Sequence, residues 1–337
     1  MNAGLEVVSA NMIDLLRYQS STGGQVDKEA ASTWLSLRSM VPSLDRVAVT
    51  PGAHATILPI LMRLTKPGDT ILSESITYPG FLRIAARLGV NVVGVPEDLD
   101  GVLPDALEYA IKTTGAKALY LNPTLNNPTT RTIPLQRRQA IATIIARHGT
   151  RLIEDDAYGF LPQNPPAPIA VFAPDLVWHI GGLAKCIGAG LRVAFTVAPG
   201  RGDALNLAQD LKTTAVMPSP LSMALATRWI VDGTADSIRR FIREETAARQ
   251  SIATEILSDF DYEASENAFN VWLKLPETYG RAEVIGQMVG SGIGLMPSDA
   301  FTVSGHPSES IRVCLGGQIS RDRLRLGLEL LAHIISN

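Results

Sequence analysis

The sequence predicts an α/β fold with a large, mostly parallel sheet flanked by helices, followed by a smaller α+β domain at the C-terminal end. Two observations predict this fold class. Short β-rich runs alternate with longer helical runs between residues 46 and 154, and turn signals such as Lys66–Asp69 separate them. From Ala268 onward the chain shows three short strands and a helix, which is typical of a small mixed domain.

Composition narrows the class of protein. The chain has 337 residues, 46% of them hydrophobic, so it can bury the cores of two domains. The net charge is −3 and both signs are mixed along the chain, which argues against a nucleic-acid-binding surface. The longest nearly apolar run, Ala53–Leu64, is too short and too polar to span a membrane, and no signal peptide is expected. Two cysteines, Cys186 and Cys314, fit free thiols in a reducing compartment, so we expect a cytoplasmic protein.

The elements follow from periodicity and turn residues. A short amphipathic run, Met12–Tyr18, is broken by Gly23 and Gly24, and a helix is expected from Asp27 to about Met40. Strands are then expected at 47–49, 70–73, 91–95, 118–121 and 151–154, with helices at 53–64, 80–88, 104–113 and 135–148 between them.

The second half of the chain begins with a proline-rich loop at 162–168. Apolar runs at 176–180 and 193–197 follow, and helices are expected at 219–231 and 236–257. Strands at 268–275, 293–295 and 311–315 and a helix at 321–334 complete the pattern. We therefore expect an N-terminal segment at 1–43, a large domain at 44–234 and a small domain at 235–337.

Residues that follow the predicted strands are the candidate site residues, because ligands bind beyond the carboxyl ends of parallel strands. After strand 47–49, Gly52, Ala53 and His54 open a helix whose free N–H groups suit a phosphate, although an ordinary turn has the same pattern. After strand 70–73 comes Tyr78, which could stack on a planar ring or pack in the core.

Polar side chains follow the next two strands. Asn127 lies in a loop with two Asn-Pro pairs, which suits turn formation or an amide that donates to a ring oxygen. Asp155 and Tyr158 follow strand 151–154. A carboxylate at a buried strand end needs a partner. A protonated ring nitrogen would supply one, and backbone N–H groups are the alternative.

One lysine, Lys185, lies in a glycine-rich turn of the stretch His179–Phe195, between two apolar runs, with Arg192 seven residues later. This arrangement can aim an amine at a phosphate-bearing cofactor. A lysine in such a turn is more often a solvent-exposed charge, so the stretch alone does not decide. The strand ends together carry the groups that one cofactor would need, and this combination favours a cofactor site.

Five motifs occur in an order that resembles fold-type I pyridoxal-phosphate enzymes of the class I/II aminotransferase group. They are TYPG at 77–80, NNPT at 126–129, DDAY at 155–158, Lys185 with Arg192, and the SIRVCLGG stretch that contains Arg312. The resemblance runs from about Tyr18 to the C-terminus. It is strongest to the aminotransferase-like domains of MocR/GntR-type regulators and to kynurenine and aminoadipate aminotransferases. It implies a large sheet of the seven-stranded type.

The resemblance implies a role for each residue. Lys185 would bind pyridoxal 5'-phosphate as an aldimine and then carry the proton, while Asp155 would pair with the pyridine nitrogen. Asn127 and Tyr158 would bind the ring hydroxyl oxygen.

Further roles concern the phosphate and the substrate. Tyr78 would stack on the ring, and Ala53, His54 and Arg192 would hold the phosphate. Arg312, with Asn127 beside it, would bind the substrate carboxylate. Tyr18 resembles the tyrosine that reaches the partner's phosphate in such dimers, although its spacing to the following glycines differs by about one residue from the family pattern.

Three positions depart from the family pattern. Gly182 stands where the family often has a phosphate-binding serine, Ala189 where proline is common, and Thr130 where a glycine usually follows NPT. These differences concern cofactor affinity rather than the fold.

The resemblance implies an aminotransferase that moves an amino group between an α-amino acid and an α-keto acid. Two alternatives stay open: a lyase that uses the same cofactor, and a non-catalytic ligand-sensing domain of the MocR type. We expect a homodimer with active sites at the interface, without a bound metal and without nucleic-acid or membrane partners. The substrate is not defined by the sequence, and Arg17, Trp272 and Met296 are candidates for its selection.

Overall fold

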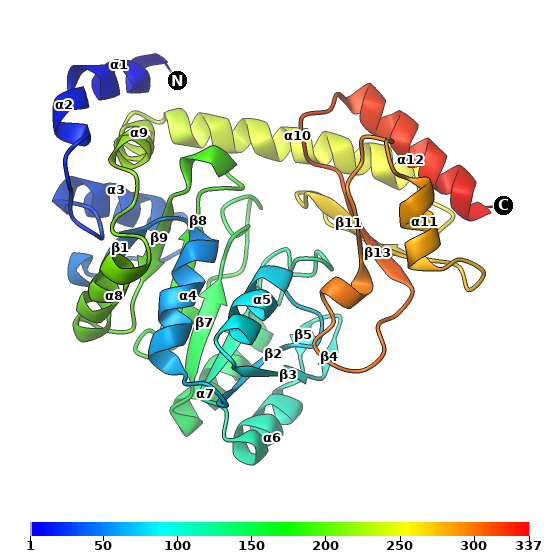
Figure 1. Cartoon of the computed structure of the whole chain (residues 1–337), viewed down its shortest axis with the longest axis horizontal. Helices are drawn as coiled ribbons and strands as arrows, with labels where there is room; N and C mark the ends of the chain where they lie inside the picture. The colour runs from blue at the N-terminus through cyan, green and yellow to red at the C-terminus, as the bar shows by residue number, and fades with distance from the viewer. Residues whose placement is uncertain (1, 337) are drawn as a thin grey trace.

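The structure is a computed structural model that describes residues 2–336. Met1 and Asn337, the outer ends of the first and last predicted domains, lie outside the described residues. The bulk of the chain forms a wide body around a large sheet, and one long helix, α10, leads from it to a smaller sheet (Figure 1).

The large sheet has seven strands in the order β1-β9-β8-β7-β6-β2-β3. Their bounds are β1 Val47–Thr50, β2 Thr70–Glu74, β3 Asn91–Val95, β6 Ala118–Leu121, β7 Arg151–Asp155, β8 Val177–Gly182 and β9 Ala194–Val197. β9 is antiparallel to both neighbours, and the other pairings, which join β2, β3, β6, β7 and β8, are parallel. All strands except β9 therefore point the same way. Their carboxyl ends share one edge of the sheet, and β9 starts from that edge. The predicted mostly parallel sheet is confirmed.

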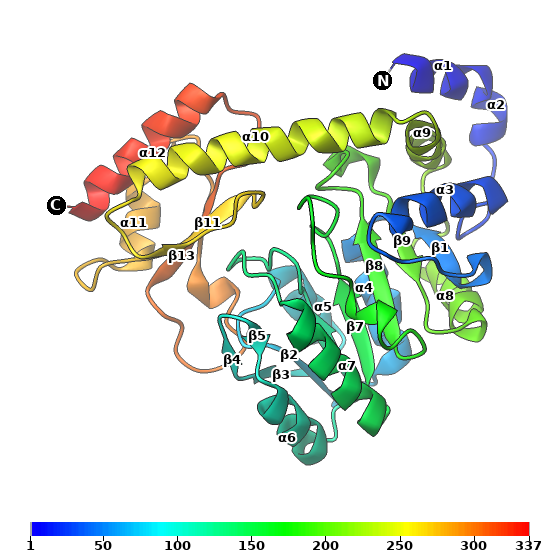
Figure 2. The ribbon, with the colours of Figure 1, turned by 180° about the vertical axis from the view of Figure 1, so that it is seen from behind.

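Helices cover both faces of this sheet (Figures 1 and 2). One face packs against α4 Ala53–Leu64, α5 Pro79–Arg87 and α8 Arg201–Thr214 through a core that includes Ile57, Phe81 and Leu207. The other face packs against α3 Gln25–Ser36, α6 Pro104–Thr114, α7 Leu135–His148 and α9 Pro220–Val231. Because both faces are buried, the central strands are apolar on both sides, as the continuous apolar runs of the sequence indicate.

The small sheet is antiparallel, with the order β10-β11-β13-β12. Its strands are β10 Tyr262–Glu263, β11 Asn270–Lys274, β12 Leu295–Pro297 and β13 Ser310–Cys314. It packs against α10 Thr234–Ile256, α11 Arg281–Gln287 and α12 Arg321–Ser336 around a separate apolar core. The large sheet lies within residues 44–234 and the small one within 235–337. The domain boundaries themselves stay a prediction.

Short elements complete the chain. The N-terminal helices are α1 Asn2–Ala10 and α2 Met12–Leu15, and a two-stranded ribbon joins β4 Glu97–Asp98 to β5 Gly101–Val102. Within residues 2–336, four 3-10 helices occur, at Leu44–Arg46, Ile169–Val171, Ala189–Leu191 and Ser298–Ala300.

The structure differs from the expected elements at several places, and the helix expected to reach about Met40 ends at Ser36. The amphipathic run expected to reach Tyr18 is helical only to Leu15, and the strand expected at 293–295 is found at Leu295–Pro297. The helices α8 and α11 were not expected. In α8 only Ala204, Leu207 and Leu211 are buried, so its apolar pattern is too sparse to stand out in the sequence. The seven-residue α11 is too short for periodicity to reveal it.

Candidate functional site

One cavity of about 280 Å³ lies where the carboxyl ends of the large sheet meet the small sheet. Side chains from the ends of β1, β2, β6, β7 and β8, from the start of β9, and from β13 contribute to it. It is lined by Ala53, His54, Tyr78, Asn122, Asn127, Asp155, Ala157, Tyr158, Gly182, Ala184, Lys185, Ala189, Arg192 and Arg312. The fold thus brings together residues that are up to 259 positions apart in the sequence, between Ala53 and Arg312.

Lys185 lies in the turn that follows β8. Its ammonium nitrogen is 5.7 Å from the ring centroids of both Tyr158 and Phe269, so two aromatic rings shield it from water. Burial lowers the pKa of Lys185, and the positive charges of Arg312 and Arg192 lower it further, while Cys314 acts in the opposite direction. An amine with a lowered pKa is available as a nucleophile and as a base.

Asp155 is the last residue of β7 and is 4% exposed. Its Oδ2 accepts a hydrogen bond of 2.8 Å from the Tyr120 hydroxyl, and its Oδ1 is buried without a hydrogen-bond partner. Burial raises the pKa of Asp155 to about 6, against the hydrogen bond from Tyr120, which lowers it. A buried carboxylate oxygen without a partner is costly, so this atom is suited to receive a donor from a bound molecule.

Asn122 connects Asp155 with the loop that carries Asn127. Its side chain donates to the backbone oxygen of Asp155 at 2.6 Å and accepts from the backbone nitrogen of Asn127 at 2.8 Å. The Asn127 side-chain oxygen in turn accepts from Nη1 of Arg312 at 2.8 Å. This chain of hydrogen bonds fixes three of the lining side chains relative to one another.

The other end of the cavity is rich in donors. Gly52, at φ +91°, precedes α4, and a Cβ on it would lie 3.2 Å from Nη2 of Arg192. The absence of a side chain at Gly52 therefore lets Arg192 approach the first turn of α4, where the N–H groups of Ala53 and His54 are found. His54 Nδ1 is 3.2 Å from the Tyr78 hydroxyl oxygen. Burial and the charges of Arg192 and Arg83 lower the pKa of His54, so its ring is neutral at pH 7. This end of the cavity suits an anion.

Nine of the ten predicted site residues lie in this cavity: Ala53, His54, Tyr78, Asn127, Asp155, Tyr158, Lys185, Arg192 and Arg312. Tyr18 does not. It lies between α2 and α3 and is 86% exposed, so its contact with a partner subunit's phosphate stays a prediction. Of the candidates for substrate selection, Arg17 pairs with Asp14 at the surface, and Trp272 packs edge-on against Phe301 in the small sheet. Met296 lies opposite Arg312 in the pairing of β12 with β13.

Sequence analysis missed two residues of the site. Asn122 directly follows β6. Its position at the end of a parallel strand is the signal that could have identified it as a site residue. Tyr120 gave no signal, because an aromatic residue in an apolar strand has the pattern of a core residue. Among residues 2–336 no cluster of His, Cys, Asp or Glu has the composition of a metal site.

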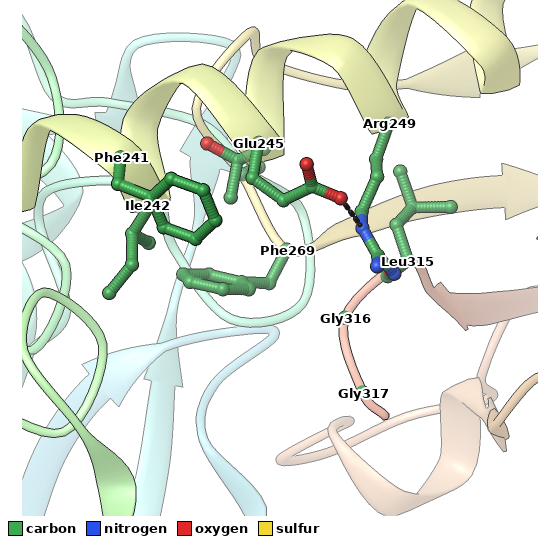
Figure 3. A pocket seen from close by; sticks show the side chains of 10 residues that line it. Phe241, Ile242, Glu245, Arg249, Phe269, Leu315, Gly316 and Gly317 are labelled. Atoms are coloured by element: carbon green, nitrogen blue, oxygen red, sulfur yellow. Dashed lines mark hydrogen bonds and ion pairs between the residues drawn. The ribbon is translucent and has the colours of Figure 1, made fainter. Parts of the chain in front are cut away.

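A second cavity, of about 140 Å³, lies between α10 and the loops of the small sheet (Figure 3). Its wall is formed by Phe241, Ile242, Phe269, Leu315 and two glycines, and the Glu245 and Arg249 side chains beside it are paired at 2.7 Å. The Phe269 ring also lies 5.7 Å from the Lys185 ammonium nitrogen. The second cavity is lined by no lysine, and its one carboxylate, Glu245, is paired.

The sequence matches the family described as aminotransferase class I and II over residues 6–330. It is 30% identical over 311 residues to an uncharacterized HTH-type transcriptional regulator of Bacillus subtilis, YdeF, an alignment that covers 92% of this chain and 67% of that protein. It is 24% identical over 332 residues to 2-aminoadipate transaminase of Thermus thermophilus, covering 95% of this chain and 81% of that protein.

Solved structures show the same fold. The α-aminoadipate aminotransferase LysN of Thermus thermophilus, complexed with N-(5'-phosphopyridoxyl)-L-leucine, superimposes with a TM-score of 0.89 at 21% identity, over 99% of this chain and 87% of that one. Kynurenine aminotransferase of Pyrococcus horikoshii gives a TM-score of 0.90 at 22% identity, over 99% and 86%.

Proposed function

Because the chain belongs to the class I and II aminotransferase family and is a pyridoxal-phosphate-dependent aminotransferase, we propose that the cavity around Lys185 is its active site. The observation that carries the proposal is the position of the buried, unpaired Asp155 Oδ1 in the same cavity as a lysine of lowered pKa. The substrates are amino acids and keto acids.

The residues present fit pyridoxal 5'-phosphate. Asp155 Oδ1 needs a donor, and the protonated ring nitrogen of the cofactor is one. The donor-rich end of the cavity, with Arg192, Gly52 and the first turn of α4, suits the phosphate group. Gly182 lines the cavity without a side chain, so the hydroxyl that the family often has at this position is missing.

Each side chain then has a task. Asp155 would keep a proton on the ring nitrogen, and Asn127 and Tyr158 would donate to the ring oxygen. Tyr78 would stack on the ring. When bound, the cofactor supplies an electron sink for the α-carbon of the amino acid. Lys185 Nζ would hold the cofactor and, once released by the incoming amino group, take the proton from the substrate α-carbon and return it.

Arg312 would bind the substrate carboxylate. Its Nη1 already donates to Asn127, its Nε is buried without a partner, and its guanidinium carbon lies 5.4 Å from the Phe301 ring centroid. The stacking holds the planar group in place while donors stay available, which suits a bidentate carboxylate.

The test is direct. The purified protein should carry a visible absorbance band from lysine-bound cofactor, and borohydride reduction followed by peptide mass spectrometry should place the cofactor on Lys185. Lys185→Ala should lose the band, whereas Lys212→Ala, at an exposed position of α8, should keep it. Native protein that binds no added cofactor would refute the proposal.

Product analysis separates the reaction types. An aminotransferase yields keto acid in proportion to the amino acid formed from the acceptor, whereas a lyase releases product without an acceptor.

A second role of the same cavity is favoured by one observation: the relatives include several HTH-type regulators of Bacillus subtilis and Escherichia coli. In that role the protein would bind the cofactor and an amino acid without completing transfer to any keto acid.

We also propose a cytoplasmic homodimer that binds neither nucleic acid nor membrane. Large apolar side chains are exposed on and beside the N-terminal helices, including Leu5, Ile13 and Leu16, and an apolar groove is lined by Trp229 of α9 and Phe241 of α10. Such a surface fits a subunit interface. Within residues 2–336 no helix has the length and apolarity to cross a membrane. Sedimentation analysis of the holoprotein tests the dimer.

A further inference from the structure

The hydroxyl of Tyr120 is fixed in the core behind Asp155. The Tyr120 ring is fully buried and lies parallel to the Phe81 ring, with centroids 3.9 Å apart and an interplanar angle of 3°. Its hydroxyl donates to Asp155 Oδ2 at 2.8 Å. A buried tyrosine hydroxyl needs a partner, and here the partner is the carboxylate itself.

The strand pairing explains why these two groups meet. β6 and β7 are parallel, with Tyr120 opposite Ile153, so Tyr120 and Asp155 project to the same face of the sheet. The stack on Phe81 holds the phenol ring, and the backbone oxygen of Asp155 is held by the Asn122 side chain. The carboxyl group is therefore fixed at Oδ2, while Oδ1 is left without a partner.

We propose that Tyr120 is a positioning residue for Asp155: its hydroxyl occupies Oδ2, directs Oδ1 to the ring nitrogen of the cofactor, and keeps the carboxyl group ionised there. The inference rests on the proposed function, since it concerns the carboxylate assigned to that nitrogen. Nothing in the sequence motifs assigns this role, because Tyr120 lies in a strand ahead of the NNPT loop.

The charged groups around Asp155 support this role. Burial raises the pKa of Asp155, Tyr120 opposes that rise, the neighbouring Asp156 adds to it, and His179 from β8 lowers it. Tyr78 and Tyr158 also face the carboxylate, and Glu74 from β2 acts on Tyr120. The Tyr120 hydroxyl is the one hydrogen-bond donor to the Asp155 side chain among the described residues. Its loss therefore removes the main local stabilisation of the anion.

The test compares Tyr120→Phe with native protein after removal of the cofactor, using pyridoxamine 5'-phosphate as the probe because it binds without a bond to Lys185. Phenylalanine keeps the ring that stacks on Phe81 and removes only the hydroxyl. Tyr109→Phe, at a residue that is 70% exposed, is the matched control. The dissociation constant is measured by calorimetry from about pH 5 to about pH 8.5, and unfolding curves check the fold.

The expected result is a pH-dependent defect. In native protein the affinity falls as the pH drops through about 6, where Asp155 takes up a proton. In Tyr120→Phe this fall starts about one pH unit higher, so the ratio of the dissociation constants rises from near one at about pH 8.5 to about tenfold at about pH 5. Asp155→Asn should show no such fall.

Two results overturn the inference while leaving the proposed function intact: a ratio near one at every pH, or a ratio that is raised equally at every pH, as a purely structural role would give. Failure of native protein to bind the probe would overturn the proposed function instead. If Tyr120→Phe does not fold, the difference between the infrared spectra of native protein and of Asp155→Asn provides the test instead. A neutral carboxylic acid band assigned to Asp155 that persists at about pH 8 contradicts the role of Tyr120.

Discussion

The substitution Glu74→Gln should stabilise the protein, and more so as the pH rises. Glu74 ends β2 and is 3% exposed. Its Oε1 accepts from the backbone nitrogen of Asn122 at 2.7 Å, and its Oε2 is 3.1 Å from the Thr77 hydroxyl oxygen. Burial raises the pKa of Glu74 from its ordinary 4.5 to about 8, and the negative charge of Glu97 adds to the rise, although the hydrogen bond from Asn122 opposes it.

The sign and size follow from that shift. Because the folded-state pKa is above the unfolded one, the folded state holds the proton more tightly between pH 4.5 and about 8. The free energy of unfolding is therefore highest below pH 4.5 and falls as the pH rises to about 8. A shift of this size corresponds to a loss of about 5 kcal/mol across that window. Glutamine does not titrate, its oxygen can accept from Asn122, and its amide group can donate to the Thr77 hydroxyl.

Urea unfolding of both proteins at several pH values measures the difference. The advantage of Glu74→Gln over native protein should grow between about pH 5 and about pH 8.5 by several kcal/mol and then level off. Glu277→Gln, at an exposed position of the small domain, should show no growing advantage. A difference between Glu74→Gln and native protein that is constant over this range would refute the reasoning.

Two further substitutions test contacts between the small sheet and the loop that follows β6. Arg312→Ala should raise KM for the amino acid by about tenfold to a hundredfold, since a charged hydrogen-bonding group is lost, while the cofactor absorbance is retained. Steady-state kinetics and a spectrum check this, and loss of the cofactor would contradict it. Arg131→Ala removes a pair with Glu263 of β10, with contacts of 2.5 and 2.6 Å, and should lower the free energy of unfolding by about 1–3 kcal/mol in urea experiments. Arg325→Ala, which breaks a more exposed pair with Glu255, should have the smaller effect, and the reverse order would contradict the burial argument.

The location of the candidate site could be predicted from sequence because the order of strands and helices largely determines which residues meet. Once short strands alternate with helices, parallel strands follow, and their carboxyl ends share an edge. Lys185 and Asn127 each come a few residues after a strand and Asp155 ends one, so their meeting needed no knowledge of side-chain contacts. The antiparallel β9 follows the same rule, because it starts at the same edge and Arg192 lies two residues before its first residue, Ala194.

Contacts that depend on register could not be predicted in the same way. The hydrogen bond from Tyr120 to Asp155 joins residues 35 positions apart, and it exists only because Tyr120 is paired with Ile153. A shift of one residue would turn Tyr120 to the other face of the sheet. Apolar patterns specify that β6 is buried on both faces but not which residue of β7 lies beside which residue of β6.

The run Glu154, Asp155 and Asp156 shows where sequence reasoning reaches its limit. The three carboxylates are adjacent and all buried, yet strand alternation sends Asp155 to one face and its neighbours to the other. Glu154 accepts from the backbone nitrogens of Ile169 and Ala170, at 2.7 and 2.9 Å.

Asp156 is satisfied in a different way, by Arg38 at 2.7 Å and His179 at 3.1 Å, which hold the pKa of its carboxyl far below the ordinary value. Both neighbours of Asp155 are thus fully paired within the protein, and neither oxygen pair is available to a ligand. Among the described residues, Asp155 alone keeps a buried carboxylate oxygen without a partner. Of the three carboxylates, only Asp155 therefore has an oxygen left for a ligand, and this difference supports the proposal that it pairs with the cofactor's ring nitrogen.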